Sequence, residues 1–213
     1  AGAPSHSIHL KPLAEDALSL PVRTGKARVI GIEPASLVTK SLVREVNTDD
    51  AGCFQSALNP GLTKIAVIER HKRTGKRGIG ILEGYGLTGG AIATTISHDS
   101  HNIVVAGDND PDMLLAVREL ADMGGGIVSV HGGAIRRLPL PIAGLMTSAD
   151  PQEVNAVLHD MLVAARAELG IPEDVEPFMT LSFMALPVIP ELKLTARGLF
   201  NVNTFSFVGV EAD

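Results

Sequence analysis

The chain has 213 residues, enough for one large domain or two small ones. Its net charge of −6 comes from 18 basic and 24 acidic residues with no dominant basic tract, which argues against nucleic acid as a partner. The single cysteine, Cys53, excludes an internal disulfide and a multi-cysteine zinc site.

The same composition indicates where the protein works. A chain with one cysteine suits the reducing cytoplasm, which is the expected location. Uncharged runs are broken by Gly or Pro before they are long enough to span a bilayer, so no membrane partner is expected. The first twenty residues lack a basic segment followed by an apolar core and are not expected to be a signal peptide.

Residues 1–25 read as an irregular lead-in or linker, punctuated by Pro4, Pro12 and Pro21. Short apolar or alternating runs of strand type follow it, and residues 72–77, "KRTGKR", are predicted to form a hairpin turn with solvated charges. These runs are residues 27–34, 36–46, 63–71, 77–86, 90–97 and 102–108.

Two helices carry clear start signals. Asp110 is predicted as the N-cap of the first, with Pro111 next and Gly124 beyond its end. Asp150 is predicted to cap the second, followed by Pro151, with Glu153 completing a capping box and an apolar stripe closed by Gly170.

Residues 126–141 lie between the two helices and predict a hairpin around a Gly-Gly turn, while 178–186 and 204–210 read as strands. The order predicts an α+β fold: mixed or antiparallel sheets of short strands with about two main helices packed on them.

Two familiar patterns have simpler structural explanations. "GYGLTG" at 84–89 fits G-x-G-x-x-G, but it leads into a strand-type run rather than a helix, so it predicts a turn and not a dinucleotide site. The acids at 108, 110, 112 and 119 fit part of a calcium loop, yet Met113 stands where that loop needs Gly, and helix capping explains them.

The segment "SHDSHN", 97–102, is the strongest candidate site. His98, Asp99 and His101 lie in a short connection between two strand-type runs, which gathers both imidazoles and a carboxylate at one sheet edge. Such a group can shuttle a proton, hydrogen-bond a purine edge or bind a metal. A tight polar turn in which Asp99 and Asn102 cap backbone amides explains the same residues, and the sequence leaves both interpretations open.

Three long stretches resemble the C-terminal domain of bacterial adenine deaminases. They are "RHKRTGKRGIGILEGYGLTGGAIATTISHDSHNIVVAGDNDPDM", "LPLPIAGLMT" and "PFMTLSFMALPVIPELKLTARGLF". The resemblance runs from about Val22 to Val208 and assigns residues 26–213 to a domain of that type.

The resemblance implies a cytoplasmic purine-salvage enzyme of the amidohydrolase superfamily that converts adenine and water to hypoxanthine and ammonia. In that family a manganese or iron pair is held by a (β/α)8 barrel upstream of the matched part. No such histidine motif is present here, so no cofactor is expected in this chain, and the isolated chain is expected to be inactive.

His98, Asp99, His101 and Asn102 match the family's H-D-S-H-N loop, while Ser97 replaces its usual Ala and Ala196 a common Asp. The resemblance implies that the loop shapes the purine pocket. There His98 or His101 would act as proton shuttle or base-edge contact, and Asp99 would orient an imidazole or accept the exocyclic amine. Ser97 and Asn102 are predicted to contact substrate, although Asn102 also suits the turn.

The predicted partners are adenine, the protein's own N-terminal barrel and, in a homodimer or other homo-oligomer, a second copy. The alternative is a non-catalytic structural or dimerisation domain of the same enzyme, in which residues 98–102 form only a turn.

Overall fold

The computed structural model describes residues 7–212; the first six residues of the predicted lead-in and Asp213 lie outside this range. Its strands are β1 (Lys26–Ile32), β2 (Thr39–Glu45), β3 (Leu62–Ile68), β4 (Arg77–Glu83), β5 (Gly90–Thr94), β6 (Ile103–Gly107), β7 (Gly126–His131), β8 (Ala134–Pro139), β9 (Leu192–Thr195), β10 (Gly198–Asn201) and β11 (Ser206–Val208). Its helices are α1 (Asp110–Asp122), α2 (Pro151–Ala167), α3 (Pro177–Phe183) and the short 3₁₀ turn η1 (Ser56–Leu58).

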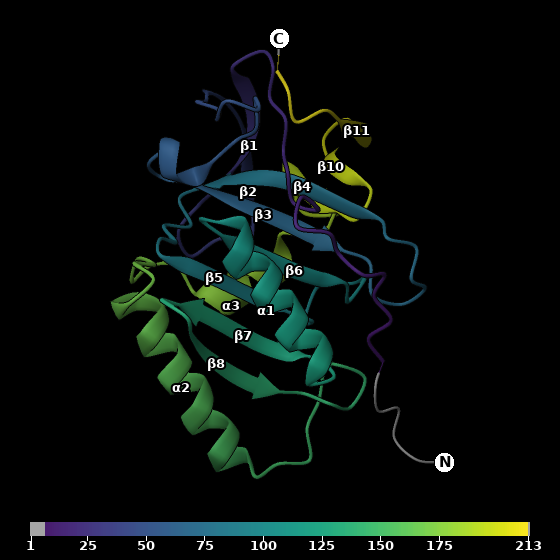
Figure 1. The fold of residues 1–213 in the computed structure, drawn as a ribbon, viewed down its shortest axis with the longest axis vertical. Coiled ribbons are helices and arrows are strands. Elements are labelled where there is room, and N and C mark those ends of the chain that lie inside the picture. Colours follow the sequence, from purple (N-terminus) through teal and green to yellow (C-terminus); the bar gives the residue numbers. More distant parts are fainter. Residues whose placement is uncertain (1–6, 213) are drawn as a thin grey trace.

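Eight strands form one sheet in the order β2-β1-β4-β3-β6-β5-β7-β8, and β9 to β11 form a separate antiparallel sheet (Figure 1). Every pairing in the large sheet is antiparallel except that between β1 and β4. The predicted α+β fold with short strands is therefore confirmed.

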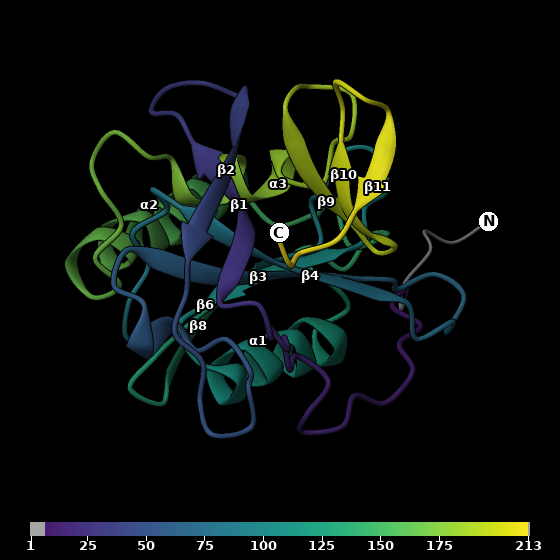
Figure 2. The ribbon, with the colours of Figure 1, turned by 90° about the horizontal axis from the view of Figure 1, so that it is seen from above.

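The large sheet is covered on both faces, which explains the nearly continuous burial of its inner strands β3, β5, β6 and β7. Figure 2 shows α1 on one face, with α2, α3 and the small sheet on the other. Alternation along β3 divides its side chains: Ile65 and Val67 join the core under α2, α3 and the small sheet, whereas Ala66 and Ile68 join the core under α1.

The chain before β1 packs as part of this fold. Residues 7–25 contain no helix or strand. Nevertheless Ala17 and Leu18 are buried in the core under α1, and Leu20 and Val22 are buried in a third cluster beside β1. Where the domain begins stays a prediction.

Several local predictions are confirmed. β7 and β8 are joined by Gly132 and Gly133, both with positive φ, as the predicted hairpin requires. β3 and β4 form a hairpin around residues 69–76. The glycines of 84–89 occupy positive-φ positions in a connection between strands.

Two predictions of where a helix lies or begins are wrong. Residues 178–186 are predicted to be a strand, but most of them form α3. The Glu176 carboxylate accepts from the Met179 amide and caps the helix, and Pro177 suits its first position. Phe178 and Leu181, three residues apart, then lie on the same buried side of the helix. The N-cap of α1 is Asn109 and not Asp110, because the side-chain oxygen of Asn109 accepts from the Asp112 amide at 2.9 Å.

Asp150 caps α2 as expected and accepts from the Gln152 amide at 2.8 Å, but within residues 7–212 no bond joins Asp150 to Glu153 as the predicted capping box requires. Among residues 7–212, no helix combines the length and the apolar character that crossing a membrane would require.

Candidate functional site

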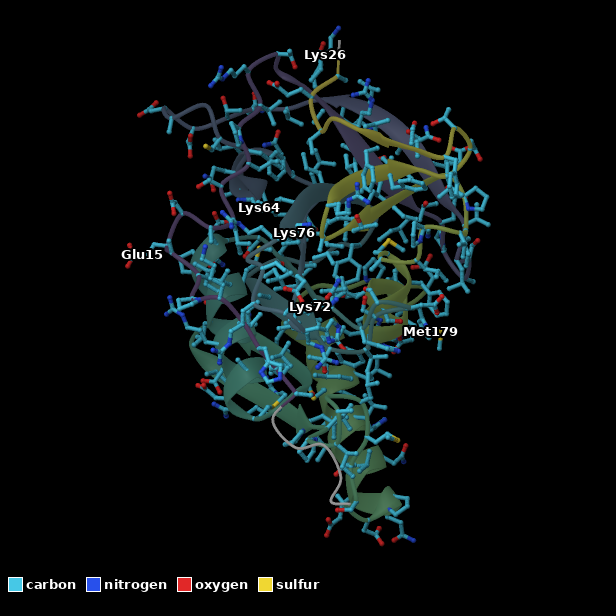
Figure 3. The ribbon with its side chains drawn as sticks, turned by 90° about the vertical axis from the view of Figure 1, so that its right-hand side faces the viewer. Glu15, Lys26, Lys64, Lys72, Lys76 and Met179 are labelled. Carbon is cyan, nitrogen blue, oxygen red and sulfur yellow. The ribbon has the colours of Figure 1, made fainter. Side chains whose placement is uncertain are left out.

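The predicted site lies in the connection between β5 and β6. The two strands are antiparallel, so residues 95–102 reverse the chain at one end of the large sheet. The His101 amide donates to the Ser97 carbonyl at 2.6 Å and closes the bend. β3 also ends here, because Ile68 pairs with Ile103, and this places the β3–β4 hairpin beside the bend. Figure 3 looks toward this hairpin, with its Lys72 and Lys76 near the centre.

The base of the bend is fixed by Thr95. Its buried hydroxyl donates to the Gly144 carbonyl at 2.5 Å and accepts from the Gly126 amide at 2.8 Å. One side chain therefore ties the end of β5 to the start of β7 and to the turn after β8.

Replacing Thr95 by Val is expected to lower the free energy of unfolding by about 1–3 kcal/mol, because both buried backbone groups lose their partner while side-chain shape is kept. Urea unfolding of the chain measures the loss. Thr74→Val is the control, since Thr74 lies in the exposed hairpin. An equal loss in the two variants would contradict the bridging role of Thr95.

His98 lies between the bend and α3. Its ring stacks on Phe183, with 4.4 Å between ring centroids and 29° between planes. Its backbone amide donates to the Ser182 carbonyl at 3.1 Å. The side chain is only half-buried, so part of the imidazole is accessible. Sequence reasoning missed Phe183, because it placed this residue in a strand.

His101 lies beside His98, with ring centroids 6.3 Å apart. Its Nδ1 is buried and has no hydrogen-bond partner among residues 7–212. Burial lowers the pKa of His101, the positive charge of Arg70 and the nearby His98 lower it further, and Asp99 opposes them. His101 thus retains an uncharged imidazole to more acid pH than an ordinary histidine.

The other predicted residues differ in accessibility. Asp99 is exposed, and within residues 7–212 no hydrogen bond joins its carboxylate to either imidazole. The Ser97 hydroxyl and the Asn102 side-chain oxygen are buried without a partner in the described chain. The structure thus brings His98 and His101 together and turns Ser97 and Asn102 inward. Their substrate contacts stay a prediction.

A third imidazole reaches the same bend. The Nε2 of His71, from the β3–β4 hairpin, lies 2.8 Å from the Ser100 carbonyl oxygen. The sequence offered no reason to connect His71 with the bend, because only the β3–β6 pairing brings them together.

The described part of the chain does not fit a hydrolytic metal centre. Residues 7–212 contain no group of three or more His, Cys, Asp or Glu side chains placed to hold a metal ion.

Comparison with known proteins agrees with the resemblance. A family model described as the adenine deaminase C-terminal domain matches residues 36–206. Adenine deaminase from Nitratidesulfovibrio vulgaris, strain Hildenborough, is 58% identical over 205 residues, which are 96% of this chain and 35% of that protein. The enzyme from Clostridium acetobutylicum is 44% identical over 205 residues, again 96% of this chain and 36% of the relative.

Adenine deaminase from Bacillus licheniformis is 44% identical over 207 residues, covering 96% of this chain and 36% of the relative. The chain thus spans about a third of the length of the curated relatives it matches. It belongs to the adenine deaminase C-terminal domain family.

Proposed function

We propose that this chain is the part of an adenine deaminase that contributes the bend 97–102 to the purine site of the whole enzyme. The observation that carries the proposal is the pairing of His98 and His101 at one sheet end, 6.3 Å apart by ring centroids, where burial lowers the pKa of His101. The whole enzyme would convert adenine and water to hypoxanthine and ammonia.

That reaction requires proton transfers. The ring nitrogen next to the reacting carbon must gain a proton, and the departing amine must leave as ammonia. An uncharged imidazole can accept a proton in one step and return it in the next. His101 has the lowered pKa suited to this role, whereas Asp99 presents an accessible carboxylate that can accept a hydrogen bond from the exocyclic amine.

His98 has a different geometry. Its stack on Phe183 holds the imidazole in one orientation, and the accessible part of the ring can then contact the edge or face of a purine. Such a contact binds substrate and transition state alike, so it acts mainly on KM.

The remaining two thirds of the enzyme would supply the metal centre. We propose a manganese or iron pair held in an N-terminal barrel, as the resemblance to adenine deaminases implies; residues 7–212 hold no group of side chains placed to bind it. The cytoplasm as location, a place in purine salvage and assembly as a homodimer belong to the same proposal.

The test is adenine deamination by the full-length protein carrying His98→Asn. KM is expected to rise about fivefold to tenfold, the equivalent of about 1 kcal/mol, with kcat within about threefold. His159→Asn is the matched control, because His159 is exposed on α2. An unchanged KM in a folded His98→Asn variant would remove His98 from the purine site.

A further inference from the structure

Arg70 is the largest fully buried side chain of the described structure. It follows β3, is 1% exposed, and lies next to the bend that carries the two histidines. No carboxylate within residues 7–212 lies within 4 Å of its guanidinium. The adjacent Glu69 is occupied elsewhere, because its carboxylate accepts from the amides of His71, Lys72 and Thr74 and from the Thr74 hydroxyl. Burial raises the pKa of Glu69, but these hydrogen bonds outweigh it and lower the pKa to about 2.

All the acceptors of Arg70 are neutral oxygens from three separate segments. Its Nε donates to the His101 carbonyl. One terminal nitrogen donates to the Ser7 hydroxyl at 3.1 Å, and the other to the Ala143 carbonyl at 3.0 Å. Gly144 leaves the space for it, since a Cβ there would lie 2.9 Å from the guanidinium.

A buried cation without a carboxylate is unfavourable for stability. Transfer from water costs free energy that neutral carbonyls recover only in part, and burial accordingly lowers the pKa of Arg70. The guanidinium nevertheless remains charged, because arginine does not lose its proton in proteins. Folding alone would favour an apolar side chain at this position.

The positions of Arg70 and His101 suggest what the charge does. We propose that Arg70 is a positioning residue that holds the carbonyl of His101 and places an unpaired positive charge beside the neighbouring imidazole. The inference rests on the proposed function, in which that imidazole transfers a proton. The two roles proposed for Arg70 are separable. The several donors of its branched guanidinium fix the bend, and its positive charge sets the proton occupancy of His101.

The groups that face His101 set the expected sign. Arg70, His98 and His71 disfavour a proton on the imidazole, whereas Asp99 favours it. Removing the charge of Arg70 should therefore raise the pKa of His101, so that the imidazole becomes protonated at higher pH. Activity that needs the uncharged form would then be lost at a higher pH as solutions are made more acid.

The experiment compares Arg70→Met, which removes charge and fork, with Arg70→Lys, which keeps the charge. NMR titration of the chain should show His101 of Arg70→Met titrating at higher pH than in the unmodified protein, and His101 of Arg70→Lys unchanged. In the full-length protein the acid limb of kcat/KM should move to higher pH for Met only. Arg70→Lys should lower kcat about tenfold or more at every pH, because an ammonium group lacks the branched guanidinium that holds the bend.

Lys193→Met is the matched control. Lys193 is also fully buried, donates to the Leu37 carbonyl at 2.8 Å, and has its pKa lowered by burial to about 8. It should cost stability without moving the His101 titration.

A His101 titration that is unchanged in folded Arg70→Met overturns the charge role, and an unchanged kcat in Arg70→Lys overturns the positioning role. If Arg70→Met does not fold, Arg70→Gln replaces it in the titration. The titration of His101 does not depend on turnover, so it tests the role of Arg70 by itself. A failure of the proposed function would appear differently, as full turnover in a variant that lacks the His101 imidazole.

Discussion

Replacing His101 by Asn in the full-length protein is expected to lower kcat for adenine deamination by about 10²- to 10⁴-fold, the range of a lost general acid–base group. Asn is the informative choice because His101 has a φ of 46°, in the left-handed region that Asn tolerates better than most residues. The backbone bend and the carbonyl bonded by Arg70 should therefore persist, while the titrating group is lost.

The measurement is steady-state turnover together with the thermal midpoint, which should change little. His131→Asn is the control: His131 is the last residue of β7, and among residues 7–212 its ring is hydrogen-bonded only to the Gly89 carbonyl, at 2.8 Å from Nδ1, so turnover should be kept. Turnover of His101→Asn within about twofold of the unmodified protein, at the same thermal midpoint, would exclude His101 from the chemistry and favour a structural or assembly domain.

The elements that sequence reasoning located well are those whose signals are local. α2 begins where Asp150 and Pro151 predict it, and the Gly132-Gly133 turn fixes the β7–β8 hairpin. The error at the start of α1 has a local cause too, because Asn109 and Asp110 are both good N-caps and their neighbours do not distinguish them.

α3 was misread for a different reason. Residues 178–186 carry no charge, so their pattern does not separate a helix from a buried strand, and a short apolar run is ambiguous by periodicity alone. Tertiary contacts select the helix. It packs against β5 and β6, and the Met184 carbonyl at its end accepts a hydrogen bond from the Leu194 amide of the small sheet. The hairpin of β9 and β10, which supplies that bond, was not predicted either.

The candidate site was predictable only as far as its own segment. A strand–loop–strand pattern placed His98 and His101 in one bend, and the structure agrees. Arg70 and Phe183, which set the environment of the two rings, come from other parts of the chain and meet the bend only through strand pairing and the packing of α3. No spacing rule relates residues so far apart, so the lowered pKa of His101 could not be foreseen.

Replacing Gly78 by Ala is expected to have the largest effect on stability, a loss of about 3 kcal/mol in the free energy of unfolding, at the upper end for overpacking. Gly78 lies in β4, where the small sheet crosses it. A Cβ there would lie 2.1 Å from the Thr195 carbonyl oxygen and 2.9 Å from the Gly198 nitrogen. Both atoms are backbone, so no side-chain rotation relieves the clash, and the β9–β10 hairpin must move.

Gly80→Ala, in the same strand and on the same face, is the matched control. Its Cβ would be 3.4 Å from the Leu199 side chain, an ordinary contact, and the change should be within about 1 kcal/mol because Ala restricts the unfolded chain. Urea unfolding of both variants gives the comparison, and equal losses would contradict a close backbone approach at Gly78.

The Gly78→Ala effect should also reach the histidines. The Leu194 amide of β9 donates to the Met184 carbonyl at 2.9 Å, directly after the residue that stacks on His98. A displaced hairpin therefore releases the end of α3 and, with it, Phe183. The NMR signals of the His98 ring should shift in folded Gly78→Ala and stay unchanged in Gly80→Ala, because only the first change moves the backbone that supports the stack.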